Sequence, residues 1–273
     1  MKMINQNCTR AFIKRNVKEM LRDPIIYVFC IGFPVVMLAL FQIINLFTSG
    51  NTPMFEAKSL VPGIIVFSFS FVALVMSLLV SKDRSSAFLI RLYTSPMAAG
   101  DFILGYAVPC LAVGIVQEFV CIFFGWIISL AVGAEYFTFG ACLLLAVAQL
   151  PMLMIAIFTG VFFGSALGEK SAPGICSVFI SASGILGGAW MPLDAMGGFE
   201  AFCRFMPFYP ATYLGRVISG AARTLPDAVT GNAVPYSFDG VAKLGLVAIA
   251  VYLVFTCVLA LVFFNRATRE KKR

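Results

Sequence analysis

Among the few side chains that could take part in chemistry, Glu118 is conspicuous because it lies inside a long apolar run. It follows Gln117 in the stretch VGIVQEFVCIFF. If this run crosses a membrane, a carboxylate there costs about 3 kcal/mol or more unless it is paired or faces protein or water. Two interpretations stay open. Glu118 contacts a substrate or a proton, or it forms an interhelical hydrogen bond, for which Gln149 in a later run is a candidate partner.

Other chemistry is scarce in the sequence. The chain has no histidine, which removes imidazole metal ligands and the most common general base. Its 8 cysteines form no close pairs, so no disulfide framework is implied. The stretch GSALGEKS superficially resembles a phosphate-binding loop, but its glycines are too close and a glutamate separates glycine from lysine. We therefore expect no catalytic, metal or nucleotide site in this chain.

Composition predicts a membrane protein. Of 273 residues, 60% are hydrophobic and 12% are charged, whereas a soluble domain carries about 25% charged residues. A helix needs about 20 apolar residues to cross a bilayer, and backbone groups in lipid must be satisfied within the helix. The fold class we expect is all-α, a single domain with six transmembrane helices. The apolar runs are 25–47, 60–80, 103–132, 139–167, 172–191 and 241–264.

The basic residues are unevenly distributed between the two sides that six spans would create. Fifteen of the 20 Lys and Arg residues fall on the side of the termini and five on the other side. Because positive charge is retained in the cytoplasm, we expect both termini to be cytoplasmic. The net charge of +7 is explained by this topology and by contact with anionic lipid head groups. It does not indicate nucleic-acid binding.

The first charged segment, 7–22, predicts an amphipathic helix that lies at the membrane interface. Its basic residues recur every four positions, at Arg10, Lys14, Lys18 and Arg22. Another face carries Ile13, Val17 and Met20. A simple anchor that holds positive charge inside is an equally valid interpretation of the same pattern.

A second amphipathic segment, 84–95, separates the second and third apolar runs, and Pro96 ends it. One arc of the predicted helix carries Phe88, Leu89, Leu92 and Tyr93, and the other side carries Arg84 and Arg91. Such an apolar arc must be covered, either by the membrane surface or by a groove in a partner protein.

After the fifth run the apolar pattern breaks up, from 192 to 240. Two short helices are expected, at Phe199–Met206 and Ala211–Ser219, with prolines between them. We predict a partly re-entrant helical cap on the external side, followed by a plain external loop that leads to the sixth span.

Three motifs resemble those of a known family. They are RDP before the first span, RLYTSPMAAGDFILGY before and into the third, and MPLDAMGGFEAFCRFMPFYPATYLGR after the fifth. In order and spacing they resemble the membrane subunit of the type-2 permease family of ABC transporters, of the kind found in bacterial drug and antibiotic exporters. The sequence departs from the family before Phe88, where family members often carry acidic residues and a glycine and this chain reads KDRSS.

The resemblance implies a permease that is not itself an enzyme and holds no cofactor. Two separate ATPase subunits would bind ATP and Mg²⁺, and a second permease copy or a paralogue would complete the transporter. It would export a hydrophobic or amphipathic small molecule, such as a drug, an antibiotic or a lipid-like compound, across the bacterial cytoplasmic membrane. The alternative is a secondary, ion- or proton-coupled transporter that uses Glu118. We disfavour it because the chain shows no duplicated half of the kind many such carriers have.

The resemblance also assigns candidate site residues. Contact with the ATPase falls to the segment before the third span, at Arg84, Phe88, Leu89, Arg91, Leu92 and Tyr93. The substrate pathway, expected between two permeases near spans two and five, has as its candidates Ser68, Ser70, Phe71, Ser177, Phe179, Ser181 and Ser183. Glu118 is a further pathway candidate, because it is an acid inside a span.

Overall fold

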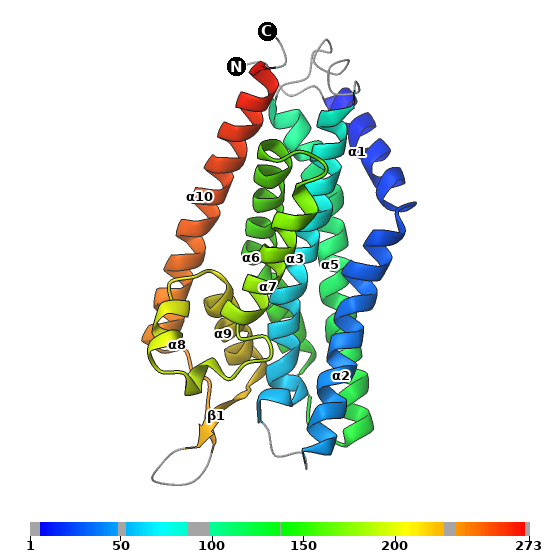
Figure 1. Cartoon of the computed structure of the whole chain (residues 1–273). Helices are drawn as coiled ribbons and strands as arrows, with labels where there is room; N and C mark the ends of the chain where they lie inside the picture. Colours follow the sequence, from blue (N-terminus) through cyan, green and yellow to red (C-terminus); the bar gives the residue numbers. More distant parts are fainter. Residues whose placement is uncertain (1–5, 49–52, 87–98, 137, 227–232, 271–273) are drawn as a thin grey trace.

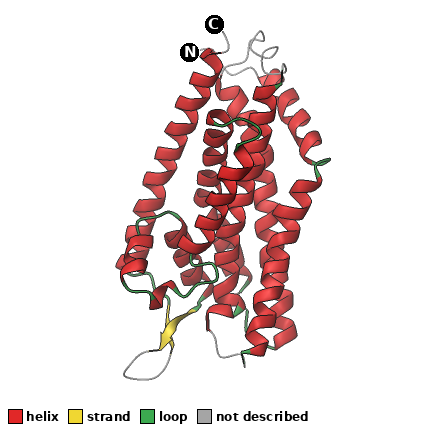
Figure 2. Ribbon diagram, viewed as in Figure 1, coloured by secondary structure: helices red, strands yellow, loops and turns green. Residues whose placement is uncertain are grey.

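The structure, a computed structural model, describes residues 6–48, 53–86, 99–136, 138–226 and 233–270. Long helices run side by side between two ends of the molecule (Figure 1). One end, here the terminal end, carries the start of α1 (Gln6–Met20) and the end of α10 (Gly240–Glu270). The opposite, distal end carries short helices and a hairpin. Helices make up nearly all of the described chain (Figure 2).

The expected all-α membrane fold is confirmed. Five helices among the described residues are long and apolar enough to cross a membrane. They are the first span at 26–47, which ends in α2 (Phe33–Phe47), then α3 (Ala57–Ser85), α5 (Ala99–Val132), α6 (Phe139–Ala166) and α10.

The first span begins as a π-helix, Ile26–Gly32, before it becomes α2. Pro34 lies just inside α2. A proline ring clashes with the carbonyl group four residues earlier and supplies no backbone N–H. The wider π-helical turn accommodates that disruption without breaking the span.

The fifth predicted span, 172–191, is shorter than expected, because α7 runs only from Ala172 to Leu186. Fifteen residues rise about 22 Å, whereas the hydrocarbon core is about 30 Å thick. Two glycines end the helix, and Gly188 has a φ of +60°, in the left-handed region that favours glycine. Phe208, at the start of the next long helix of the cap, packs beside Gly187.

The central element is α3, which packs against α5, α6, α7 and α9. In its most apolar stretch 89% of the residues are buried, whereas the corresponding share in α10 is 17%. The peripheral helices therefore present much of their apolar surface to lipid, and α3 contacts mainly protein.

Small residues bring α6 and α3 into backbone contact. A methyl group added at Gly160 would lie 2.6 Å from the carbonyl oxygen of Ala73, and one at Gly164 would lie 2.7 Å from that of Ser77. Neither distance leaves room for a side chain. Gly168, four residues further along, has no atom of α3 within 4 Å of such a methyl group. The close contact is therefore made by Gly160 and Gly164.

The cap contains α8 (Gly198–Cys203) and α9 (Phe208–Ser219), close to the two expected helices. Short 3-10 turns lie at Leu193–Ala195 and Pro53–Phe55. The predicted plain loop is wrong in part, because it includes an antiparallel hairpin of β1 (Ala222–Pro226) and β2 (Ala233–Pro235).

Arg216 fixes α9 inside the bundle. Its side chain is 2% exposed, and its guanidinium donates to the carbonyl oxygens of Ser59 at 3.1 Å and Gly188 at 2.8 Å. It also donates to the hydroxyl of Tyr236 at 3.3 Å. Because each acceptor belongs to a different segment, this one cation joins α9 to α3, to the turn after α7 and to the chain that follows β2.

A second polar cluster anchors the start of α10. Asp239 accepts hydrogen bonds from the backbone N–H groups of Val241 and Ala242, from the Tyr213 hydroxyl and from Arg223. Burial alone would raise the pKa of Asp239, but these hydrogen bonds and the positive charge lower it below its usual range. Burial, with the hydrogen bond to Asp239, raises the pKa of Tyr213 to about 12.

The glycine contact predicts that Gly160→Ala destabilises the protein, because the new methyl group forces α6 away from the α3 backbone. Overpacking of this kind costs about 1–3 kcal/mol. Gly140 lies on the same helix with nothing within 4 Å of an added methyl group, so Gly140→Ala is the matched control. Thermal unfolding in detergent should show a lower Tm for the first variant only. Equal Tm values would contradict the packing role.

The Asp239 cluster predicts a pH-dependent difference between the protein and its Asp239→Asn variant. A lowered pKa in the folded state gives stability that is present above the unfolded pKa of about 3.9 and is lost as the pH falls through the folded value. Asparagine can still cap α10 but carries no charge for Arg223. The variant should melt lower at pH 7, and the difference should shrink below about pH 4. A difference that is constant with pH would contradict this electrostatic role.

Candidate functional site

The predicted coupling segment begins at the terminal end of α3. Its expected start at 84 is wrong, because α3 continues through Ser85 and Arg84 lies in its last turn. There Arg84 donates to the carbonyl oxygen of Leu167, at 3.1 Å. The other assigned coupling residues lie outside the described residues, and these are Phe88, Leu89, Arg91, Leu92 and Tyr93.

Asp83 lies at the centre of a polar cluster immediately before that segment. It is 2% exposed, and Arg15 of α1 donates to both of its carboxylate oxygens, one at 2.8 Å. The hydroxyl of Tyr106, on α5, donates to the same carboxylate at 2.9 Å. A two-pronged arginine–carboxylate pair is both strong and directional. Asp83 therefore joins α1, α3 and α5 at one point.

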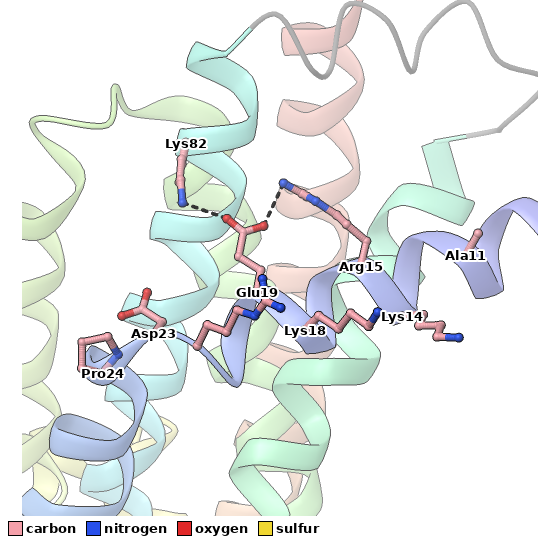
Figure 3. Close-up of a pocket in the computed structure, with 9 residues that line it drawn as sticks. Ala11, Lys14, Arg15, Lys18, Glu19, Asp23, Pro24 and Lys82 are labelled. Carbon is pink, nitrogen blue, oxygen red and sulfur yellow. Dashed lines mark hydrogen bonds and ion pairs between the residues drawn. The ribbon is translucent and has the colours of Figure 1, made fainter.

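The neighbouring carboxylates raise the pKa of Arg15. Burial would lower the pKa of Arg15, but the hydrogen bond and charge of Asp83, with the charge of Glu19, raise it instead. Glu19 forms ion pairs with Arg15 and with Lys82 of α3, each at 2.8 Å. Figure 3 shows Arg15 and Lys82 converging on Glu19 from α1 and α3. The outer pairs extend the contact between these two helices toward solvent.

The inner face of α1 differs from the predicted one. Its buried residues are Thr9, Phe12, Asn16 and Met20, whereas Ile13 and Val17 are only half-buried. Two of these buried side chains, Thr9 and Asn16, are polar, and α5 supplies a hydrogen-bond partner for each. Thr9 donates to Asp101 at 3.0 Å, and Asn16 donates to the Gly105 carbonyl oxygen at 2.9 Å. The predicted basic row does remain exposed.

Glu118 is 1% exposed and belongs to α5, a helix that packs against α3 and α6. Its predicted hydrogen bond to Gln149 is absent among the described residues, because Gln149 instead donates to the Ala211 carbonyl oxygen at 2.9 Å. One carboxyl oxygen of Glu118 and both amide atoms of Gln117 are buried without a partner among the described residues. The contact with a substrate or a proton stays a prediction.

The candidate pathway residues fall in different places. Ser68, Ser70 and Phe71 of α3 are buried, and the two hydroxyl groups bond to carbonyl oxygens of their own helix. Ser183, on α7, is buried in the same way, with its hydroxyl on the Ile180 carbonyl oxygen. Within a single chain these four side chains are therefore closed off from the surface.

The remaining α7 candidates are accessible. Ser177 and Ser181 are exposed, one helical turn apart on the outward face of α7. Phe179 lines an almost wholly apolar pocket of about 200 Å³ between α6, α7, α9 and α10. The structure thus offers an outward hydroxyl-bearing face and an apolar pocket beside it.

Sequence reasoning missed Arg15, Asp83 and Tyr106 as a unit. A signal existed, since Asp83 is an acid in the last turn of a long apolar helix, where an unpaired carboxylate would be costly. Its partners lie 68 residues before it and 23 residues after it, so spacing alone could not pair them.

Comparison with known proteins places these features in a family. Residues 7–220 match the family described as ABC-2 type transporter. This range contains all three motifs named above, the Asp83 cluster and the cap through α9. No curated protein matches the sequence significantly. The family match covers well over half of the 273 residues. The chain therefore belongs to the ABC-2 type transporter family and is a multi-pass permease of that class.

Proposed function

We propose that this permease exports a hydrophobic or amphipathic small molecule, driven by ATP that separate ATPase subunits hydrolyse with Mg²⁺. In this proposal the chain is not an enzyme and binds no cofactor. The observation that carries the proposal is the Asp83 cluster. It ties α1 and α5 to α3 beside both ends of segment 87–98, where the family is expected to contact its ATPase.

The proposed coupling follows from connectivity. Segment 87–98 joins the end of α3 to the start of α5. A displacement of this segment by an ATPase acts directly on both helices. Through Arg15 the same displacement reaches α1, and from α1 it reaches the first span. The cluster therefore connects α3, α5, α1 and the first span to the movement of this one segment.

The proposed substrate route lies on the outward face of α7, between this chain and a second permease copy or a paralogue. Gly174, Ser177 and Ser181 give that face small and hydroxyl-bearing positions, and Val178 and Ile185 give it apolar ones. Small residues permit close approach of helices, and mixed polar and apolar lining suits an amphipathic ligand. We further propose that the terminal end is cytoplasmic in a bacterial inner membrane, as the distribution of basic residues indicates.

The coupling proposal predicts that Asp83→Asn uncouples transport from ATP hydrolysis. The chain should copurify with an ATPase encoded in a neighbouring reading frame, and the two together in proteoliposomes should transport substrate. The variant should retain that ATPase but lose roughly tenfold in transport per ATP hydrolysed, equivalent to about 1.4 kcal/mol of lost coupling.

Glu169→Gln is the matched control, because Glu169 is an exposed acid at the same end that accepts a hydrogen bond from Ser85. It should leave coupling unchanged. Failure of the wild-type chain to bind any such ATPase would contradict the proposed function. Normal coupling in the Asp83→Asn variant would contradict only the role of the cluster.

Transport by the wild-type chain and by Glu118→Gln, measured with ATP and with or without a proton gradient, separates the ABC mechanism from a proton-coupled one. An amide in place of a partly unpaired buried carboxyl should leave Tm unchanged or raise it. If Glu118 contacts substrate, transport should change while ATP remains necessary and a proton gradient does not. Loss of all transport on collapse of the proton gradient, with ATP present, would favour the alternative, a secondary transporter. Unchanged transport and Tm would remove Glu118 from the pathway.

A further inference from the structure

The outward side of α1 borders a groove whose charge is strongly unbalanced. The groove has a volume of about 730 Å³ and is lined by five basic and two acidic side chains. Lys14, Lys18 and Arg22 lie at intervals of four residues along its edge and are exposed. Figure 3 shows Lys14 and Lys18 side by side on one face of α1, while Arg15 and Glu19 point toward α3.

The ion pairs of the groove leave part of its positive charge uncompensated. Arg15 and Lys82 are paired with Glu19, and Arg15 also with Asp83. The second acid, Asp23, accepts a hydrogen bond from the backbone N–H of Ile25. Lys14, Lys18 and Arg22 have no ion pair among the described residues. An anion in the groove would therefore lie toward these three cations and away from Glu19.

An apolar cleft of about 250 Å³ lies on the neighbouring side of the same helix. It is enclosed by α1, the π-helical segment and α5, and no charged side chain lines it. Val17 and Leu21 on its wall follow Lys14 and Lys18 by three residues each, and residues three apart are neighbours on a helix surface. The cationic groove and the apolar cleft therefore share an edge.

The position of the two features relative to the membrane identifies the ligand. The first span begins at Ile26, just after Arg22, so the cations lie at the level of the lipid head groups. The cleft is walled by Ile31 and by Val113 and Val116, which belong to spans and lie at the depth of the acyl chains. A soluble phosphate could use the groove but has no group for the cleft.

We propose that this site binds one anionic phospholipid. Its phosphate lies among Lys14, Lys18 and Arg22, and one acyl chain occupies the cleft between α1 and α5. A zwitterionic lipid fits less well, because its own cation would face the uncompensated positive charge. A bound lipid would lie at the joint between α1 and the first span, independently of what the permease transports.

The charge part of the proposal is tested by native mass spectrometry of the purified protein with phosphatidylglycerol or phosphatidylcholine. The double variant Lys14→Gln, Lys18→Gln should lower bound phosphatidylglycerol by about tenfold or more. The control, Arg10→Gln with Arg266→Gln, removes the same charge from exposed positions outside the groove and should retain the lipid. Equal loss in the control, or equal binding of phosphatidylcholine to the wild type, would overturn the proposal.

The acyl-chain part is tested by filling the cleft. Ala112 is exposed and lines the cleft, so Ala112→Trp should displace the chain and lower phosphatidylglycerol binding without changing any charge. Ala131→Trp places the same group at an exposed position of α5 outside the cleft and should not. Retained lipid in Ala112→Trp would refute the site, as would displacement of the lipid by inorganic phosphate. Tm measurements check that each variant is folded. If the lysine double variant does not fold, Ala112→Trp alone tests the site.

Discussion

The structure depends on the burial of α3 by protein on nearly every side. A helix that contacts lipid needs only apolar side chains, but a helix surrounded by protein can carry polar groups if each finds a partner. This explains why the charged residues that matter most in the described chain gather at the ends of α3. Asp83 at one end binds groups from α1 and α5, and the carbonyl oxygen of Ser59 at the other end accepts from Arg216 of α9. Both ends are thereby fastened to the elements that surround them.

The polar contacts at the two ends of α3 differ in a way that bears on function. At the distal end one fully buried arginine bonds mostly to backbone carbonyl oxygens, which do not titrate and have fixed positions. At the terminal end the contact is between side chains, with Arg15 partly exposed and further paired to Glu19. Side-chain pairs near solvent rearrange at lower cost than a buried guanidinium held by the backbone. The terminal end is thus better suited to transmit a displacement, and the distal end to resist one.

Much of the fold could be predicted because long apolar runs leave few alternatives in a bilayer. The α6 helix, expected at 139–167, lies at Phe139–Ala166, and α5 ends at Val132 as expected. The end of α7 could not be placed, because 187–191 is apolar enough for a span and only the backbone shows that Gly188 turns. The buried face of α1 was also missed. Thr9 and Asn16 look like solvent-facing residues until α5 supplies Asp101 and the Gly105 carbonyl oxygen. The α7 hydroxyl groups were predicted, but which of them face outward required the packing.

The contact between α6 and α3 has a mechanical consequence. Gly160 and Gly164 meet carbonyl oxygens of α3 and the side chains of Met76 and Val80, and they place no side chain of α6 at this contact, so the two helices are packed with little room to adjust. Neither sliding nor rotation of one past the other is possible there without a clash. A conformational change of the permease must therefore keep α3 and α6 together as one rigid unit and move other helices. The first span and α5 each have only 33% of their most apolar stretch buried, and α10 has 17%, so protein contacts constrain these helices less than they constrain α3.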